Sequence, residues 1–254
     1  MTNSVLYEKR GNICLITLNR EDTRNALSPD IIDELVKILE DVDNNEDISC
    51  AIITGAGKSF SSGGNLHEIN DMTEDNKMSL RDIENWYRNG IQKIPTTFNK
   101  IDVPIIAAVN GHAIGAGNDL CTMCDIRIAS EDAKFSESFL RIGIIPGDGG
   151  SWFLPKIIGL SRATEMILTC DVLDAKKALD WGLVSQVVPK DKLLDTAFQL
   201  ADKIVQNPPQ SIRRAKRLLR LTQNTNLSTA LEMAASQQTL LQMTNDHKEA
   251  IQAL

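Results

Sequence analysis

Three glycine-rich segments, each placed after an apolar stretch, carry the clearest chemical potential in this chain. They lie at residues 62–65, 115–118 and 147–150. Because glycine has no side chain, backbone N–H groups in such segments can approach a ligand closely. Two segments that face each other can aim two N–H groups at one oxygen atom, where they stabilise negative charge that develops on a carbonyl. The first two segments therefore predict an oxyanion hole.

A carboxylate follows the second glycine segment. Residues 105–109 are an apolar run suited to a strand buried on both faces, and Asn110 with Gly111 turns the chain. Residues 120–124 then indicate a helix, whose exposed N-terminal amides favour negative charge. Asp119 lies at the start of that helix. We expect Asp119 to lie close enough to act on a ligand bound by these amides.

Apolar and alternating runs predict the strands that position these segments. A run of four to eight such residues bounded by turn residues is typical of a strand. Strands are predicted at residues 5–17, as a hairpin around Gly11, and at 49–54, 105–109, 125–129, 133–139 and 184–188.

Helical spacing and helix-start residues predict the connecting helices. Apolar residues recur every three or four positions from Leu80 through Tyr87 to Ile94, which predicts an amphipathic helix ending before Pro95. The polar residues 70–76 before it are expected to be mobile. Helices are also predicted at about 29–41, 120–124, from 151, and at 161–170, 175–181, 191–206, 211–221 and 228–254.

The chain divides into two regions by this pattern. Residues 1–190 alternate strands, glycine segments and helices, whereas residues 191–254 are helical and are expected to pack on the core or on another subunit. One helix of the second region is basic, and it is either a solvated or intersubunit face or a surface that steers an anionic ligand. Its cations are Arg213, Arg214, Lys216, Arg217 and Arg220.

Composition excludes several classes of protein. Of the 254 residues, 42% are hydrophobic and 24% charged, and no apolar run approaches the roughly 18 residues of a membrane helix. The net charge of −7 disfavours nucleic-acid binding. The N-terminal sequence lacks the pattern of a signal peptide, so a cytoplasmic location is expected. The five cysteines are odd in number and scattered, as expected of reduced, buried thiols.

Metal and nucleotide motifs are incomplete. With three histidines, a histidine metal site or a Ser/His triad has little support, and we predict no metal. The sequence before Gly57-Lys58 has Ile52 where a phosphate-binding loop needs glycine, and Leu120 occupies the last glycine position of a dinucleotide fingerprint. No nucleotide cofactor is predicted.

Three ordered segments resemble the enoyl-CoA hydratase/isomerase family, also called the crotonase superfamily. They are GKSFSSGGNL at 57–66, NGHAIGAGNDLCTMCDIRIAS at 110–130 and KFSESFLRIGIIPGDGGSWFLPKIIG at 134–159. The likeness extends from about Val5 to Pro189. It implies an α/β fold made of a spiral of repeated β-β-α turns, followed by a C-terminal helical trimerisation region. It also implies a homotrimer or a dimer of trimers.

The resemblance also implies a ligand and roles for particular residues. Members of the family bind acyl-CoA thioesters and stabilise an enolate on the thioester oxygen with two backbone amides, which here correspond to Gly64 and Ala116. Coenzyme A is part of the substrate, so no separate cofactor is implied. Residues expected to contact the substrate or its coenzyme A portion are Arg24, Ala26, Ser62, Asn65, Leu66 and Phe139.

The chain departs from the family pattern at its acids. Hydratases of the family carry two glutamates, at the positions of Asp119 and Phe139 here, and phenylalanine cannot transfer a proton. Two acids are candidates for the missing partner. Glu137 shares a face with Phe139 if this segment is extended. Asp148 lies in the third glycine segment, beside the position where family members that shift dienoyl double bonds carry an acid, although it can also cap the following helix.

The sequence thus predicts an acyl-CoA enzyme in which Asp119 is the main acid/base, with Glu137 or Asp148 as its partner. Hydration of a 2-enoyl-CoA, as in fatty-acid β-oxidation, is the leading reaction. Isomerisation of an enoyl-CoA or dienoyl-CoA double bond is the alternative that suits the missing glutamate. A non-catalytic acyl-CoA-binding oligomer is a third alternative.

Overall fold

A hairpin opens the fold, as predicted. In the computed structural model, which describes residues 3–73 and 78–252, β1 (Val5–Arg10) pairs antiparallel with β2 (Ile13–Leu18). Gly11 at the turn has a φ of +60°, which a residue with a side chain rarely adopts. β2 continues into a larger sheet.

The main sheet has six strands, in the order β1, β2, β3 (Cys50–Gly55), β5 (Ile105–Val109), β7 (Ile126–Ser130) and β10 (Gln186–Val188). From β2 onward, neighbouring strands run parallel. β3 and β5 are buried along their whole length, as their continuous apolar sequence requires in a sheet that is covered on both faces.

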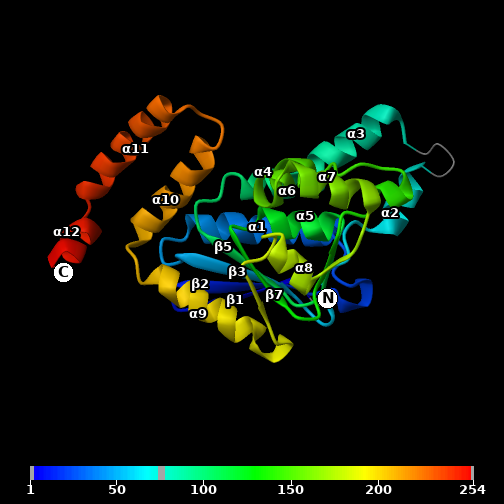
Figure 1. The fold of residues 1–254 in the computed structure, drawn as a ribbon, viewed down its shortest axis with the longest axis horizontal. Helices are drawn as coiled ribbons and strands as arrows, with labels where there is room; N and C mark the ends of the chain where they lie inside the picture. The colour runs from blue at the N-terminus through cyan, green and yellow to red at the C-terminus, as the bar shows by residue number, and fades with distance from the viewer. Residues whose placement is uncertain (1–2, 74–77, 253–254) are drawn as a thin grey trace.

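Alternate strand residues face two separate cores. On one face, Ile52 and Ile106 pack with α9 (Leu193–Val205). On the other face, Ile53 and its neighbours pack with α1 (Pro29–Asn44), which begins at the predicted Ser28-Pro29 start. Figure 1 shows α1 and α9 on opposite sides of the sheet. The sheet is thereby the middle layer of three.

A smaller sheet carries the first two glycine segments. It consists of β4 (Ser59–Ser61), β6 (His112–Ile114) and β8 (Lys134–Ser136), which run parallel, and β9 (Leu173–Asp174), which runs antiparallel to β8. β4, β6 and β8 each follow a strand of the main sheet, so the chain repeatedly crosses from one sheet to the other. This repetition confirms the predicted spiral of β-β-α turns. β4, β6 and β9 were not predicted because two or three residues give no measurable periodicity.

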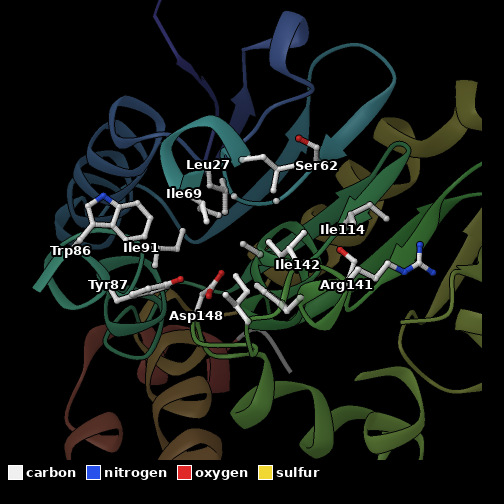
Figure 2. A pocket seen from close by; sticks show the side chains of 18 residues that line it. Leu27, Ser62, Ile69, Trp86, Tyr87, Ile91, Ile114, Arg141, Ile142 and Asp148 are labelled. Carbon is white, nitrogen blue, oxygen red and sulfur yellow. The ribbon is translucent and has the colours of Figure 1, made fainter. Parts of the chain in front are cut away.

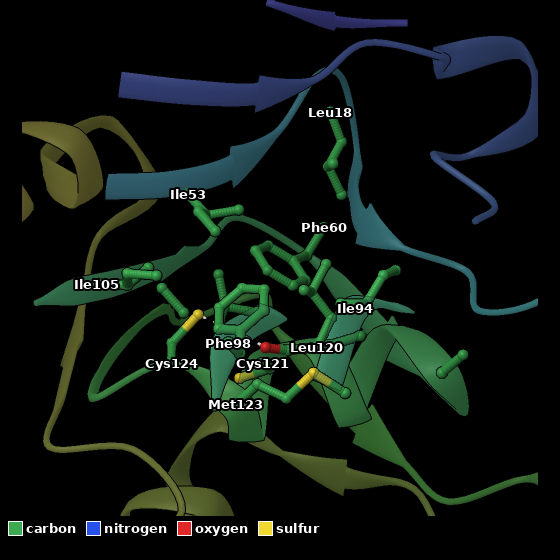
Figure 3. Packing of buried hydrophobic residues seen from close by; sticks show 14 of the residues in the cluster. Leu18, Ile53, Phe60, Ile94, Phe98, Ile105, Leu120, Cys121, Met123 and Cys124 are labelled. Carbon is green, nitrogen blue, oxygen red and sulfur yellow. Dashed lines mark hydrogen bonds between the residues drawn. The ribbon is translucent and has the colours of Figure 1, made fainter. Parts of the chain in front are cut away.

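The remaining helices of the core fill the space between and beside the sheets. They are α2 (Leu66–Thr73), α3 (Leu80–Asn89), α4 (Lys93–Phe98), α5 (Ala116–Met123), α6 (Gly150–Ile158), α7 (Leu160–Thr169) and α8 (Ala175–Asp180). α5 is buried along its whole length, and Figure 3 shows Leu120, Met123 and Cys124 at its end packed with Phe60 and Phe98. The second glycine segment is therefore anchored from behind by a packed helix.

The cysteines are free and buried, as predicted. Cys121 and Cys124 belong to the packing around α5, and the Cys124 thiol donates a weak hydrogen bond to the Leu120 carbonyl at 3.5 Å. Burial raises the pKa of the Cys121 thiol to about 12. These thiols are packing groups and not nucleophiles.

The predicted helix ending before Pro95 is wrong in its boundary. α3 begins with a capping box between Ser79 and Asp82 but ends at Asn89, and Gly90 interrupts it. α4 then starts at Lys93 and contains Pro95. Proline is tolerated there because the first turn of a helix has no intrahelical partner for its N–H groups.

Three other boundaries differ from the sequence-based expectation. α5 begins at Ala116 and not near Leu120, so the second glycine segment is largely its first turn. β8 stops at Ser136, well before the predicted strand end at 139. Residues 70–73 of the segment expected to be mobile belong to α2, and residues 74–76 lie outside the described residues.

The C-terminal region contains α9, α10 (Pro209–Thr222), α11 (Leu227–Gln242) and α12 (Asn245–Gln252). The single helix predicted at 228–254 is thus two, because the Thr244 hydroxyl accepts a hydrogen bond from the N–H of His247 and starts α12. α10, α11 and α12 lie beyond one end of the main sheet, opposite to α2 and α3 (Figure 1). Trimerisation through this region stays a prediction. Every helix in residues 3–73 and 78–252 is too short or too polar to cross a membrane.

Basic residues of α10 contact the core of the same chain, whereas an intersubunit or ligand-steering role for them stays a prediction. The Arg213 guanidinium donates to the carbonyls of Asp43, Asn45 and Ile48 at 2.8–3.0 Å, just before β3 begins. Basic residues of α10 also form ion pairs with the core. Arg213 pairs with Asp43, Lys216 with Asp125, and both Arg217 and Arg220 with Asp102. These side chains fasten α10 to the amino ends of β3, β5 and β7.

Candidate active site

A cavity of about 340 Å³ lies at the carboxyl ends of β4, β6 and β8. Figure 2 shows side chains converging on it from the first glycine segment, from α3 and from the third glycine segment. Most of its wall is apolar, which suits a hydrocarbon chain. The apolar side chains that line it are Leu27, Leu66, Ile69, Trp86, Ile91, Ile114, Ala116, Phe139, Ile142 and Ile144.

The two residues predicted to supply amides, Gly64 and Ala116, both line this cavity. Ala116 is the first residue of α5, after Gly115 at the N-cap, so its N–H has no partner within the helix. Neither N–H donates a hydrogen bond to another residue that the structure describes. Both donors are therefore available to a ligand.

Close backbone contacts hold the two glycine segments together. A side-chain carbon on Gly63 would lie 2.5 Å from the carbonyl oxygen of Ile114, and one on Gly117 would lie 2.3 Å from that of Ser61. The N–H of Leu27 also donates to the Gly63 carbonyl at 2.8 Å. Glycine is required at both positions because a larger residue would force the segments apart.

Asp119 lies in the first turn of α5 but does not line the cavity. Its side chain is fully buried and packs against Gly150. A Cβ atom at position 150 would collide with the Asp119 carboxyl group, so only glycine fits there. The polar groups that act most directly on its carboxyl are the Glu137 carboxyl and the N–H of Gly150. Burial, and next the negative charges of Glu137 and Asp148, raise the pKa of Asp119 well above its usual value.

Glu137 is also buried behind the wall. Asn118 donates to its Oε1 at 2.5 Å, and the Asp119 carboxyl is its other polar neighbour. The expectation that Glu137 and Phe139 share a face of one strand is wrong, because the chain leaves the extended conformation after Ser136 and Phe139 begins a 3-10 turn. Phe139 consequently lines the cavity while Glu137 faces the interior. Burial raises the pKa of Glu137 to about 7.

Asp148 is the acid of these three that reaches the cavity. It lines the wall, with 5% of its surface exposed, and Figure 2 shows its carboxyl group among the converging side chains. The helix-cap alternative is wrong, since the N-cap of α6 is Gly149, with a φ of +113°, and no side chain caps this helix. Burial raises the pKa of Asp148 to about 7. Such a group is present in both protonation states near neutral pH, as proton transfer requires.

The predicted coenzyme A contacts gather around a second hollow. This hollow adjoins the cavity, has a volume of about 560 Å³, and shares Ser62, Gly64, Leu66 and Ile114 with it. Arg24, Ala26 and Asn65 also line it. The structure therefore brings the predicted substrate-binding residues together along one path into the cavity.

The turn that carries Arg24 and Ala26 is fixed by a buried amide. Arg24 and Asn25 both have positive φ, of 55° and 57°. The Asn25 side chain donates to the carbonyls of Ala56 and Ser59 at 3.0 and 2.9 Å, and accepts from the N–H of Arg20. These bonds stabilise a backbone conformation that a residue with a side chain rarely adopts.

Sequence reasoning missed the contribution of α3 to the site. Trp86 and Tyr87 line the cavity, with their rings edge to face and 5.1 Å apart between centroids. Tyr87 was assigned to the apolar stripe of a core helix, where an aromatic residue is ordinary. A signal was available, because a phenol among isoleucines needs a polar partner when it is buried.

Similarity to known proteins shows which family the chain belongs to. The enoyl-CoA hydratase/isomerase family model matches residues 8–254. The chain belongs to this family. Within the crotonase superfamily, the chain is 33% identical to the short-chain-enoyl-CoA hydratase of Clostridium acetobutylicum, over 99% of the chain and 94% of that relative. It is 36% identical to the 2,3-dehydroadipyl-CoA hydratase of Escherichia coli, over 99% and 95%.

An isomerase and a solved structure of the crotonase superfamily also match the chain over nearly its whole length. The 1,2-epoxyphenylacetyl-CoA isomerase of Escherichia coli is 32% identical, over 100% of this chain and 95% of that relative. A crystal structure of an enoyl-CoA hydratase from Bacillus anthracis superimposes with a TM-score of 0.89 at 34% identity, covering 98% of this chain and 95% of that one. The fold and the membership of a family of lyases and isomerases are therefore established together.

Proposed function

We propose that this enzyme hydrates the 2,3 double bond of an enoyl-CoA thioester. The observation that carries the proposal is one cavity lined by two unpartnered glycine-segment amides, at Gly64 and Ala116, and by one acid with a pKa of about 7, at Asp148. Two such donors stabilise an enolate on the thioester oxygen. The hydratase names among the full-length relatives support the same reaction.

In the proposed reaction, Asp148 moves the proton. Its carboxylate takes a proton from water as the water oxygen bonds to C3, and the π electrons shift toward the thioester oxygen. The N–H groups of Gly64 and Ala116 stabilise the resulting negative charge. Asp148 then gives the proton to C2, the carbonyl re-forms, and the product is a 3-hydroxyacyl thioester.

We assign Asp119 a role behind Asp148. Asp119 is fully buried and its pKa responds to the charge of Asp148, so the two carboxyls interact although Asp119 does not line the cavity. Burial and the charges of its neighbours favour the protonated form of Asp119, which limits how much negative charge this part of the interior holds. Glu137, also buried, belongs to the same group of acids.

Double-bond isomerisation is the second candidate. It is favoured by Phe139, which occupies a place on the wall where a second proton-transferring group would help hydration. A single carboxyl such as Asp148 suffices to carry a proton from C4 to C2 or in the reverse direction.

The substrate and assembly are proposed on the same basis. The second hollow, lined by Arg24, Ala26 and Asn65, is proposed to hold coenzyme A as part of the substrate, with no further cofactor. The C-terminal helices are proposed to join subunits into a homotrimer or a dimer of trimers. Large apolar side chains exposed on α11 and α12 support this, namely Leu227, Leu231, Leu240 and Ile251. Light scattering of the purified chain measures the assembly.

Product analysis on a panel of acyl-CoA thioesters tests the function. Crotonyl-CoA is expected to give a 3-hydroxyacyl product, whereas 3-enoyl-CoA rearranged without hydroxyacyl product would replace hydration by isomerisation. Binding without turnover of any member would leave only the acyl-CoA-binding alternative.

One variant tests the amide pair directly. Ala116→Pro removes an N–H at the first position of α5, where proline is well accommodated. We expect kcat to fall by about 10²–10³-fold with the fold retained. A folded Ala116→Pro enzyme with unchanged kcat would remove Ala116 from the mechanism. Leu160→Pro, which places proline at the first position of α7 away from the cavity, is the matched control.

A further inference from the structure

A phenol hydroxyl faces the proposed proton-transferring acid. Tyr87 on α3 and Asp148 in the third glycine segment both line the cavity. Figure 2 shows the hydroxyl end of the Tyr87 side chain directed toward the Asp148 carboxyl group. An apolar wall thus carries two polar groups at one place.

Both groups are available to a ligand. Neither the Tyr87 hydroxyl nor the Asp148 carboxyl makes a hydrogen bond to another residue that the structure describes. Two other polar side chains on the wall, those of Ser62 and Arg141, are engaged elsewhere. The Ser62 hydroxyl donates to the Thr23 carbonyl, and Arg141 donates to the Cys170 carbonyl and points away from the cavity in Figure 2. A half-buried hydroxyl and a buried carboxyl without partners are costly unless a ligand or water fills the place between them.

Gln92 links the segment that carries Tyr87 to the segment that carries Asp148. The N–H of Gln92 donates to the Tyr87 carbonyl at 3.1 Å, and its side-chain amide donates to the Gly147 carbonyl at 2.8 Å. The end of α3 is thereby joined to the residue before Asp148. The edge-to-face contact with Trp86 holds the Tyr87 ring from its other side. The pair is therefore positioned by the fold before any ligand enters.

We propose that the Tyr87 hydroxyl and the Asp148 carboxyl together hold the water molecule that adds to C3 of the substrate. The inference rests on the proposed hydration. Water donates one hydrogen to the Asp148 carboxylate and the other to the Tyr87 oxygen, which orients a lone pair of the water oxygen toward the double bond. Asp148 takes the first proton as the C3–O bond forms and returns it to C2. The second hydrogen stays on the new hydroxyl group, so Tyr87 gains and loses no proton.

Tyr87 is suited to bind water without exchanging protons. Burial, and next the negative charge of Asp148, raise the pKa of the Tyr87 phenol above its usual value of 10. It therefore stays protonated at neutral pH. Phe139 cannot form a hydrogen bond to water, and the phenol provides the second polar contact that one carboxyl alone lacks.

Two reactions of the same site separate this role from the proton transfer itself. Hydration of crotonyl-CoA needs the held water, whereas exchange of the C2 hydrogens of butyryl-CoA with deuterated solvent needs the amides and Asp148 but adds no water. For Tyr87→Phe we expect kcat for hydration to fall by about tenfold or more with little change in KM. The exchange rate is expected to stay near that of the unaltered enzyme.

The control uses the other tyrosine of the chain. Tyr7, one of two tyrosines, is exposed on β1, and Tyr7→Phe removes the same hydroxyl group away from the cavity. It is expected to change neither reaction.

Each other outcome overturns the proposal in a recognisable way. Unchanged hydration by Tyr87→Phe, while Asp148→Asn is inactive, removes the water site and leaves the proposed function standing. A parallel loss of exchange shows that the hydroxyl positions Asp148 and does not hold water. An unaltered enzyme that neither hydrates nor exchanges loses both the proposed function and the water site.

Discussion

The acidic side chains at the two ends of this fold differ in burial and in whether a basic side chain pairs with them. At the amino ends of β3, β5 and β7, Asp43, Asp125 and Asp102 are each paired with a basic side chain of α10. At the carboxyl ends of β4, β6 and β8, Asp119, Glu137 and Asp148 are more deeply buried, and none is paired with a cation in the part of the chain that the structure describes.

The two groups of acids differ in what they are suited to do: the paired ones join elements of the fold, and the unpaired ones suit proton transfer. A paired carboxylate is stabilised in its charged form and joins two elements. An unpaired buried carboxyl keeps its proton to higher pH, which costs stability but gives a group that titrates near neutrality. Asp148 is placed where that property is useful, because it also reaches the cavity.

An Asp→Asn substitution made at each of the two ends is expected to show the largest difference between them. Asp148→Asn removes the proposed acid/base, and we expect kcat/KM for the preferred enoyl-CoA to fall by about 10²–10⁴-fold with the fold intact. Asp102→Asn, at the other end, should leave kcat/KM close to that of the unaltered enzyme while lowering the free energy of unfolding. Steady-state kinetics and denaturant unfolding measure the two effects. Comparable activity in both variants would contradict the assignment of Asp148.

Asp119 gives an intermediate case. Asp119→Asn keeps the size of the side chain but removes a carboxyl that interacts with Asp148 from behind the wall. We expect a smaller loss of kcat than for Asp148→Asn. The reverse order, measured in the same assay, would return the role of main acid/base to Asp119, as expected from the sequence.

The unpaired acids also predict how stability depends on pH. The folded chain holds the Glu137 proton to about pH 7, whereas the unfolded chain releases it near pH 4.5. In this window the folded state binds more protons, so stability falls as pH rises from about 4.5 to about 7. In Glu137→Gln this component disappears, which amounts to at most about 3 kcal/mol. Urea unfolding at pH 5 and pH 8 measures it, and equal pH dependence in both proteins would rule it out.

The contacts of Arg213 on α10 predict a smaller effect on stability. Arg213→Met keeps the apolar stem of the side chain but leaves the Ile48 carbonyl without its donor and removes one of the two donors to the Asn45 carbonyl. We expect a loss of about 2 kcal/mol in the free energy of unfolding at fixed protein concentration. Arg88→Ala, which breaks an exposed pair with Glu84, is the control and should stay within about 0.5 kcal/mol. Equal effects would mean that α10 is not fastened by Arg213.

Sequence predicted the long elements well, and it named Gly64 and Ala116, which the structure brings to one cavity. Strands such as β5 and the glycines around Gly64 and Ala116 have strong local signals, namely continuous apolar runs and residues without side chains. The acids were harder. Whether Asp119 or Asp148 reaches the cavity depends on how α5 and α6 pack, and no local pattern records that packing.

The contributions of distant segments could not be found from local patterns at all. Tyr87 and Asp148 are about sixty positions apart, and the link through Gln92 exists only in the folded chain. The contacts of the basic helix α10 could not be found for the same reason, since its partners before β3, β5 and β7 lie far earlier in the chain. Short strands such as β4 are stabilised by their neighbours and not by their own sequence.

The contacts of Gly63 with Ile114 and of Gly117 with Ser61 have a consequence for how new activities arise on this scaffold. They set the spacing of the two amides through backbone atoms alone, so the amide pair does not depend on which acids surround it. A change at Asp119, Phe139 or Asp148 can therefore alter the proposed path of the proton and leave the proposed binding of an enolate untouched. Reaction type and enolate binding can vary independently, which allows a chain of this kind to acquire a new reaction by few substitutions.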